Sequence, residues 1–279
     1  MVIESWLDDS SKICEGEYNL NKGVAERCAQ SGDFDVLAKN YTHIAPHEII
    51  DLLKRIDNSK KVFSGQGIDL GGGPGIVASS IAKAFDCKID FVEIVREVIE
   101  LGYPIVSKHF GASIDQRVHP VVGSFDEVKR NNNNYSFCIA WDALHHSNSP
   151  TKTLKEALRV TQSGGYFVLV DRAHNNSVTT AECEAMMDKK YPRNFLIEHN
   201  LKPDAIFTRR QNGEHEYRFS DLTNFFEEAG WTLVENFLVL EKHERNEFYK
   251  NDFLARQGFV DFEIGGYERR KLVLVAQKL

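Results

Sequence analysis

The chain lacks the sequence features of several protein classes. Its five cysteines among 279 residues are irregularly spaced and contain no Cys-x-x-Cys pair, so neither a disulfide framework nor a structural zinc site is indicated. No stretch approaches the ~18 apolar residues of a membrane-spanning helix, and the N-terminus lacks a basic region followed by an apolar run. We therefore expect a cytoplasmic protein with free thiols, no metal ligands and no membrane partner.

Basic residues are fewer than acidic ones. The chain has 34 basic and 41 acidic residues, a formal net charge of -7, and no long basic run. A nucleic-acid partner would leave a basic patch, so none is expected. The length suits one α/β domain with additions, and 42% apolar residues are enough for a core.

Apolar spacing divides the chain into a helical N-terminal part and an alternating part. Residues 1–60 carry apolar residues at helical spacing, with Pro46 suited to a helix start, which predicts a helical cap. Strands alternate with helical stretches after residue 60, which predicts βαβ units and a parallel sheet. The expected strands are 62–70, 88–94, 118–122, 135–141 and 166–170, with helices at 76–85 and 151–161 and a Gly164-Gly165 turn before the fifth strand.

The alternation stops after Asp171. Residues 173–218 are polar, with one helical patch near 181–190, and so long an interval in a compact domain is usually a lid or binding element. A helix at 220–229 follows, opened by Ser220 and closed by Gly230. The rest of the chain predicts strands at 231–240 and 271–277, with a helix at 244–257 between them.

The most informative segment is a glycine-rich turn, Ile-Asp-Leu-Gly-Gly-Gly-Pro-Gly at 68–75. Gly71, Gly73 and Gly75 remove Cβ atoms where a strand turns into a helix, so a ligand can lie against the backbone. No Lys-Ser/Thr pair follows as in a P-loop. Asp69 would repel a pyrophosphate and could attract a cation. These details argue against a phosphate-binding loop.

Four segments, in this order and spacing, resemble the class I S-adenosylmethionine-dependent methyltransferases over about residues 35–240. They are Asp69–Gly75, Phe91–Ile94, Trp141–His146 and Ala157–Val170. The resemblance implies a Rossmann-like three-layer sandwich with a seven-stranded, mostly parallel sheet whose last strand is antiparallel. It also implies a methyltransferase domain at 61–279, an N-terminal helical cap at 1–60 and a lid insertion at about 173–218, after strand five.

The resemblance implies S-adenosylmethionine as cofactor. In this family Asp69 orients the loop and the methionine end, Gly71 and Gly73 let the cofactor pass over the backbone, and Glu93 is placed to accept both ribose hydroxyls. Ser124 stands where the family often has an acid facing the adenine, so either Ser124 or Asp126 takes that contact. The remaining residues implied in cofactor binding are Tyr41, Ile94, Phe125 and Trp141. Tyr41 resembles the tyrosine that reaches the cofactor carboxylate, although helix packing explains it equally well.

Methyl transfer requires an aligned nucleophile, and a base only when the acceptor must lose a proton. His145 and His146 follow strand four at the expected substrate edge and are candidate bases; alternatively, one of them packs beside the cofactor. His215, in the polar run 214–218, is a third candidate base. The candidate substrate-binding residues are Arg172, Glu216, Tyr217 and Arg218, although the run 214–218 also suits an exposed charged loop.

We expect a small-molecule methyltransferase that acts on oxygen rather than nitrogen, and the cap and lid offer surfaces for a homodimer. N-methylation and methylation of a macromolecule are the alternatives within the class. A nicotinamide-dependent oxidoreductase is the alternative outside it, but Ile76 stands at the third position of Gly-x-Gly-x-x-Gly and Pro74 lies inside the turn. A methyltransferase-like subunit without catalysis also remains open.

Overall fold

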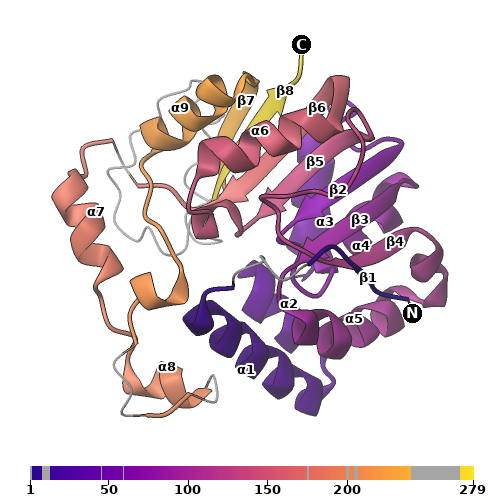
Figure 1. Ribbon diagram of the computed structural model, residues 1–279. Helices are drawn as coiled ribbons and strands as arrows, with labels where there is room; N and C mark the ends of the chain where they lie inside the picture. Colours follow the sequence, from indigo (N-terminus) through magenta and orange to yellow (C-terminus); the bar gives the residue numbers. More distant parts are fainter. Residues whose placement is uncertain are drawn as a thin grey trace, which may run out of the picture.

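Eight strands form one sheet: β1 (Glu4–Ser5), β2 (Gln66–Leu70), β3 (Lys88–Glu93), β4 (Val118–Val122), β5 (Tyr135–Trp141), β6 (Thr161–Asp171), β7 (Thr232–Val239) and β8 (Lys271–Gln277). Their order across the sheet is β1-β4-β3-β2-β5-β6-β8-β7 (Figure 1). Neighbours pair in parallel except at β8, which runs antiparallel to β6 and β7. The computed structural model describes residues 2–7, 13–44, 46–58, 60–174, 176–198, 201–203, 207–239 and 271–279.

Helices cover both faces of this sheet (Figure 1). They are α1 (Glu15–Ser31), α2 (Phe34–Thr42), α3 (Pro46–Asp57), α4 (Ile76–Phe85), α5 (Arg96–Phe110), α6 (Pro150–Val160), α7 (Thr180–Met187), α8 (Arg193–Glu198) and α9 (Phe219–Ala229), with 3-10 turns η1 (Ala112–Gln116), η2 (Leu144–His146) and η3 (Arg210–Asn212). Side chains of α3, α4 and α5 share a core cluster with one face of the sheet, and α6 and α9 share a second cluster with the other face. Helix α1 packs on α5 and meets η3.

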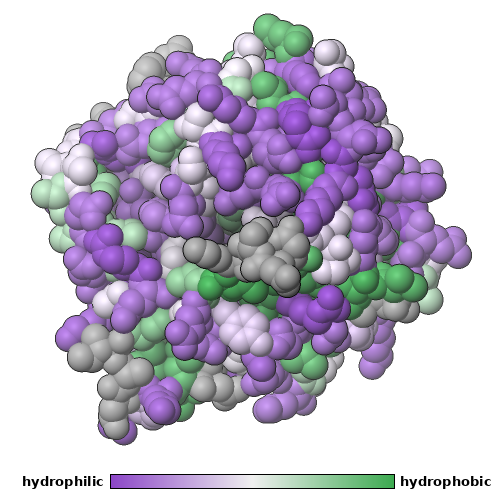
Figure 2. All heavy atoms as spheres, viewed as in Figure 1, coloured by the Kyte–Doolittle hydropathy of each residue, from purple (hydrophilic) through white to green (hydrophobic). Residues whose placement is uncertain are grey.

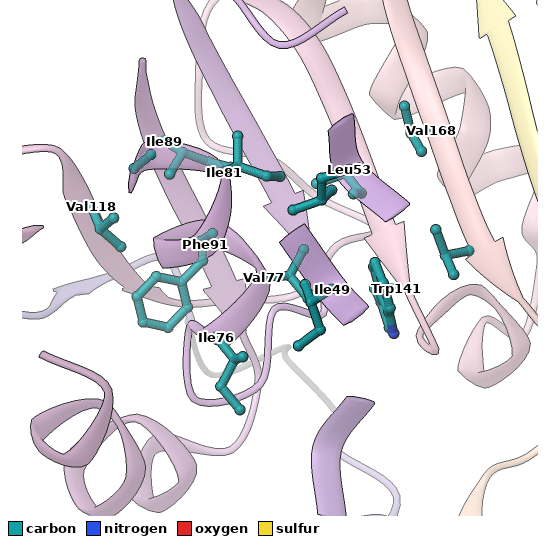
Figure 3. Packing of buried hydrophobic residues seen from close by; sticks show 14 of the residues in the cluster. Ile49, Leu53, Ile76, Val77, Ile81, Ile89, Phe91, Val118, Trp141 and Val168 are labelled. Atoms are coloured by element: carbon teal, nitrogen blue, oxygen red, sulfur yellow. The ribbon is translucent and has the colours of Figure 1, made fainter. Parts of the chain in front are cut away.

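Side chains that alternate along the strands build these two cores. Ile49 and Leu53 from α3 and Ile81 from α4 lie over Ile89 and Val168 of the sheet, and all five are almost completely buried (Figure 3). Successive side chains of a strand point to opposite faces, so the strands of a parallel sheet covered on both faces are apolar at nearly every position. The predicted three-layer α/β architecture with an antiparallel last strand is therefore confirmed.

The strand count differs from the prediction by one. Residues 4–5, expected within a helical cap, form β1 and pair in parallel with β4 at the sheet edge. The Trp6 amide donates to the Val122 carbonyl at 2.7 Å. The Trp6 ring is buried and lies under the Arg130 guanidinium, 4.7 Å from the ring centroid. This anchoring through one aromatic residue explains why the segment extends the sheet.

Two local predictions are wrong. Gly164 and Gly165 lie within β6 rather than in a turn before it: β6 advances from Thr161 to Tyr166 while its partner β5 advances from Tyr135 to Phe137, so β6 bulges. A Cβ at Gly165 would lie 2.6 Å from the neighbouring strand's Ser136 carbonyl oxygen, so a glycine permits this close approach.

The second wrong prediction concerns the helix after the polar interval. Helix α9 begins at Phe219, and Ser220 does not cap it. The Arg218 amide instead donates to the Asp221 carboxylate at 2.9 Å, which satisfies a backbone group at the helix start. The polar interval also contains α8, which the sequence pattern did not indicate. The helix predicted at 244–257 lies outside the described residues.

The surface is mainly hydrophilic on the face shown in Figure 2, with a hydrophobic band across its lower half. In the described part of the chain, none of the helices combines the length and the apolar character needed to cross a bilayer.

Phe167→Ala is expected to lower the free energy of unfolding by about 3–5 kcal/mol, because a buried aromatic side chain is removed from a packed core. The Phe167 ring lies 5.3 Å from the Phe226 ring and 5.5 Å from the Trp231 ring, centroid to centroid. Urea denaturation measures the change. Val36→Ala, at a partly exposed position of α2, is the control, and an equal loss in the two variants would contradict this packing.

Candidate active site

The glycine-rich turn lies at the centre of the sheet, where the chain leaves β2 for α4. Gly71 and Gly73 have φ values of +72° and +53°, which side chains rarely adopt. A Cβ at Gly71 would lie 2.4 Å from the Ala143 side chain, and one at Gly73 would lie 3.2 Å from the Tyr41 ring. These glycines therefore keep a narrow space open above the turn.

Asp69 is the acid of this turn, and it is completely buried. Neither of its carboxylate oxygens has a hydrogen-bond partner among the described residues. Burial raises the pKa of Asp69 to about 7, and the neighbouring Glu93 contributes to this rise. A buried carboxylate without a partner is costly. Its oxygens therefore favour a cationic or hydrogen-bond-donating ligand.

Glu93 ends the adjacent strand β3. Its carboxylate accepts the Val95 amide hydrogen at 2.8 Å. Burial raises its pKa to about 7, against the lowering effect of backbone amides from Val95, Ile94 and Gly73. β3 and β5 flank β2 on opposite sides, so the chain reverses its direction of winding here. Such a switch point is where open α/β sheets bind ligands.

A cavity of about 350 Å³ opens above this edge of the sheet. It is lined by the glycine turn, by the ends of β3 and β5, by α1 and by the end of the polar interval. Its acidic lining residues are Glu17, Asp69, Glu93, Asp126, Asp142 and Glu214, against a single arginine, Arg210. This first cavity therefore has a strongly acidic lining.

A second cavity of about 590 Å³ adjoins the first. Five residues line both cavities and form their shared wall: Asn21, Tyr41, Asp142, His146 and Glu214. The charged lining of the second cavity is mainly basic, with Arg172, Lys189, Lys190, Arg209 and Lys271 against Asp142 and Glu214. The two cavities therefore differ in charge.

The two consecutive histidines of η2 have different environments. The His145 ring is buried, and its Nδ1 lies 2.7 Å from the Asp171 carboxylate. His146 lines both cavities, and its Nδ1 lies 3.5 Å from the Glu17 carboxylate of α1. Burial lowers the pKa of both histidines, that of His145 most strongly, so both are neutral at pH 7. Of these two, only His146 reaches the first cavity.

The polar interval is tied to the sheet through buried ion pairs. Arg172, directly after β6, donates to Glu214 at 2.6 Å, and Glu216 accepts from Arg209 and lies 2.9 Å from His174 Nε2. Burial opposes ionisation of Glu214, but its ion pair with Arg172 holds its pKa at about 2. The interval therefore brings fixed negative charge to the shared wall.

Three acidic or histidine side chains near the second cavity lie close enough together to be considered as a metal site. Asp142, His145 and Asp171 bring one ligand atom each to within 4.8 Å of one another. However, Lys271 donates to Asp142, and Asp171 accepts from the amides of His145 and Arg172 as well as facing the His145 ring. The cluster is a hydrogen-bonded charge network, and Asp142 Oδ2 is its one carboxylate oxygen without a hydrogen-bond partner among the described residues.

The structure gathers most of the predicted site residues at the first cavity. Those that line it are Tyr41, Asp69, Gly71, Gly73, Glu93, Ile94, Ser124, Phe125, Trp141, His146 and His215. His145 and Arg172 line the second cavity instead. Glu216, Tyr217 and Arg218 line neither cavity and have internal partners: Tyr217 donates to the Ser147 carbonyl at 3.2 Å, and Arg218 pairs with Asp221.

Sequence reasoning missed the contribution of α1. Glu17 and Asn21, one helical turn apart, both line the first cavity, and Asp142 lines both cavities. Helix α1 reaches η3 through a hydrogen bond from the Cys14 thiol to the Gln211 carbonyl at 3.2 Å. No local pattern links α1 to residues almost 200 positions later. Asp142 follows β5 directly and belongs to the predicted motif Trp141–His146, but the sequence analysis gave it no role of its own.

Asp69→Asn is expected to raise the free energy of unfolding of the ligand-free protein at pH 8 by more than about 1 kcal/mol. The folded protein holds a proton on this carboxyl up to a pKa of about 7, whereas an unfolded chain releases it near pH ~4. Rising pH therefore destabilises the wild type across this window. Urea denaturation at pH 5 and pH 8 measures the effect, with the exposed Asp51→Asn as control. A difference that does not grow with pH would contradict the assignment.

Comparison with known proteins identifies the family to which the chain belongs. Residues 41–236 match a family described as a methyltransferase domain. The chain is 30% identical over 104 residues to a sarcosine/dimethylglycine N-methyltransferase of Aphanothece halophytica, a match that spans 37% of this chain and only 36% of that relative.

Solved structures share the fold. A candidate sarcosine dimethylglycine methyltransferase from Galdieria sulphuraria superposes with a TM-score of 0.57 at 18% identity, over 84% of this chain and 85% of that one. A geranyl diphosphate C-methyltransferase from Streptomyces coelicolor, solved with S-adenosyl-L-homocysteine, gives 0.56 at 10% identity, over 85% and 78%. The two unpartnered oxygens of Asp69 and the open glycine turn fit a cofactor that is cationic and carries no phosphate. The chain therefore belongs to the methyltransferase family, and S-adenosylmethionine is its methyl donor.

Proposed function

We propose that this protein methylates an amine nitrogen of a small molecule. The observation that carries the proposal is the acidic first cavity, which meets the second cavity at Asp142, His146 and Glu214. Acidic side chains stabilise both the sulfonium of the donor and an ammonium group on the acceptor. The names of the matched relatives, which are N-methyltransferases, agree with this acceptor class.

For the cofactor, we assign the first cavity. Glu93 accepts the ribose hydroxyls, Asp69 faces the methionine end, and the glycine turn lets the ligand lie against the backbone. Phe125 and Ile94 pack on the adenine beside Ser124, and Asp126, which accepts from Thr153, supports that loop. Tyr41 and Trp141 border the methionine end from the opposite side. These assignments rest on the lining of the cavity and on the matching sequence motifs.

For the acceptor, we assign the second cavity, with the polar interval 173–218 as its lid. The five residues of the shared wall mark where the two ligands meet. Arg172 and Lys271 approach this wall from the sheet, and Arg209 and Lys190 line the cavity from the lid. Arg172, Arg209 and Lys271 pair with Glu214, Glu216 and Asp142, and Lys189 and Lys190 give the surroundings of this cavity an excess of positive charge. This excess suits an anionic group, so the acceptor carries a carboxylate or similar group besides its amine.

The chemistry required of the protein is modest. Bound S-adenosylmethionine supplies an activated methyl group, and the protein aligns the acceptor nitrogen with it and excludes water. An ammonium has no lone pair, so a proton must leave before the nitrogen can attack. His146 lines both cavities, is neutral at pH 7 and is placed to accept that proton. His215 is the second candidate base, at the first cavity.

Oxygen was the acceptor that the sequence favoured. An alcohol or phenol could enter the same cavity and use the same base, but it would gain nothing from the acidic lining. We therefore propose nitrogen as the methyl-accepting atom, and the experiment below distinguishes it from oxygen. The predicted homodimer stays a prediction.

Purified protein incubated with methyl-labelled S-adenosylmethionine is expected to label amines in a panel that includes glycine, sarcosine and dimethylglycine, together with alcohols and phenols of matched size. Mass spectrometry identifies the products. Labelling of hydroxyl compounds alone would overturn the nitrogen assignment but not the methyltransferase activity. Labelling of added protein or RNA alone would overturn the assignment of a small acceptor.

Glu93→Gln is expected to weaken binding of S-adenosylhomocysteine by about ten- to a hundredfold, since a hydrogen bond to a charged group is worth ~1.5–3 kcal/mol. The ribose hydroxyls donate hydrogen bonds and therefore favour the ionised form of the Glu93 carboxylate, whose pKa in the ligand-free protein is about 7. The wild type should therefore release a proton on binding near pH 7, and affinity should rise with pH through this range. Calorimetry in two buffers of different ionisation enthalpy measures the release. Glu127→Gln is the control, and unchanged proton release in Glu93→Gln would contradict this role.

A further inference from the structure

The carboxylate of Glu17 approaches the one histidine that faces both cavities. Glu17 Oε1 lies 3.5 Å from His146 Nδ1, and that ring nitrogen is buried with no hydrogen-bond partner among the described residues. The neighbouring His145 already has a carboxylate, Asp171, at the equivalent ring nitrogen. Each histidine of η2 therefore has its own acidic side chain, one from the sheet and one from α1.

Two contacts with α5 hold α1, and with it Glu17, in position. The Tyr18 hydroxyl donates to Glu97 of α5 at 2.5 Å, and Lys22 lies 3.4 Å from the same carboxylate. These contacts on the α5 side fix the rotation of α1 about its axis. They leave Glu17, about 100° around the helix from Tyr18, directed into the first cavity, which it lines.

Groups on three other segments surround the Glu17 carboxylate. Glu93 of β3 and Glu214 of the polar interval repel its charge, and His146 lies beside it. A Cβ at Gly213 would lie 3.4 Å from Glu17 Oε2, and Arg210 of η3 lines the same cavity. Burial is the main cause that raises the pKa of Glu17, to about 8, and the two glutamates add to it. Glu17 therefore binds and releases protons close to neutral pH.

We infer that Glu17 and His146 form a proton-accepting pair for the acceptor amine, with His146 Nε2 as the accepting atom and Glu17 as the positioning residue. The inference rests on the proposed function. In the step, the ammonium N–H bond breaks and its proton passes to His146. The freed nitrogen lone pair then forms the N–CH₃ bond while the S–CH₃ bond breaks and its electron pair stays on sulfur. The ionised Glu17 carboxylate stabilises the imidazolium until its proton passes to solvent.

This role explains why a carboxylate lies opposite an otherwise unpartnered ring nitrogen. A carboxylate at Nδ1 favours the tautomer with a proton on that atom, which leaves Nε2 free to accept one. A cationic donor and a cationic acceptor in the cavity both favour the ionised carboxylate. Binding of the two substrates therefore prepares the pair to accept a proton.

The test is the titration of His146 in protein with labelled imidazole nitrogens and bound S-adenosylmethionine, without an acceptor, because the sulfonium of this ligand favours the ionised Glu17 carboxylate. NMR follows the titration, and His146→Asn assigns it. We expect Glu17→Gln to lower the pKa of His146 by about one unit or more, because an opposite charge within ~4–6 Å has been removed. Glu15→Gln, an exposed residue on the same helix, should leave it unchanged. Glu17→Gln should also lower kcat about a hundredfold for an amine that the wild type methylates, with a far smaller change in S-adenosylhomocysteine affinity. Glu17→Asp should restore part of the rate.

Two results would overturn the inference. The first is an unchanged titration of His146 in a folded Glu17→Gln protein with S-adenosylmethionine bound. The second is a loss of rate in Glu17→Gln without a change in the pH profile of kcat, which would indicate a structural role. Neither result affects the proposed function, which depends on the labelled products of the wild type. If the wild type labels hydroxyl compounds only, the amine assignment fails, and the inferred role with it.

Discussion

The structure depends on one costly feature, a completely buried carboxylate at the carboxyl end of the central strand. Asp69 has no hydrogen-bond partner in the described part of the chain, and its neighbour Glu93 adds repulsion. Two such groups at the switch point of the sheet are unfavourable until a ligand supplies donors and positive charge. The glycine turn, the two flanking strands and the covering helices all leave space for that ligand. The protein therefore gives up some stability in order to be ready for its cofactor.

The sheet could be predicted because its signals are local. The apolar runs, the glycine turn and the acid at residue 93 each lie within a few residues, and their order identified the fold and the cofactor. The sheet edge could not be predicted in this way. Strand β1 is two residues long and depends on the burial of Trp6, and the bulge in β6 depends on the approach of Ser136 from the neighbouring strand. Tertiary contacts decided both features.

The residues of the candidate site also divide into those that local motifs predicted and those that depend on tertiary contacts. The residues on the strand ends were found by motif, and almost all of them line the first cavity. The acceptor side was seen less well, because Glu216 and Arg218 looked available in the sequence but have buried or local partners in the structure. Glu17 was missed because its significance comes from contact with His146, 129 positions later. A sequence does not show such a pair unless the helix that carries it can be placed.

The contact between α1 and η3 has a consequence for the timing of turnover. Gly16 packs so closely that a Cβ there would lie 1.8 Å from the Gln211 carbonyl oxygen, and the Cys14 thiol bonds to the same carbonyl. Widening the first cavity on this side must break both contacts together. The opening is then a concerted movement of two segments rather than a rearrangement of single side chains. Motions of that kind occur in microseconds to milliseconds, the range in which exchange of spent for fresh cofactor sets the speed of many enzymes.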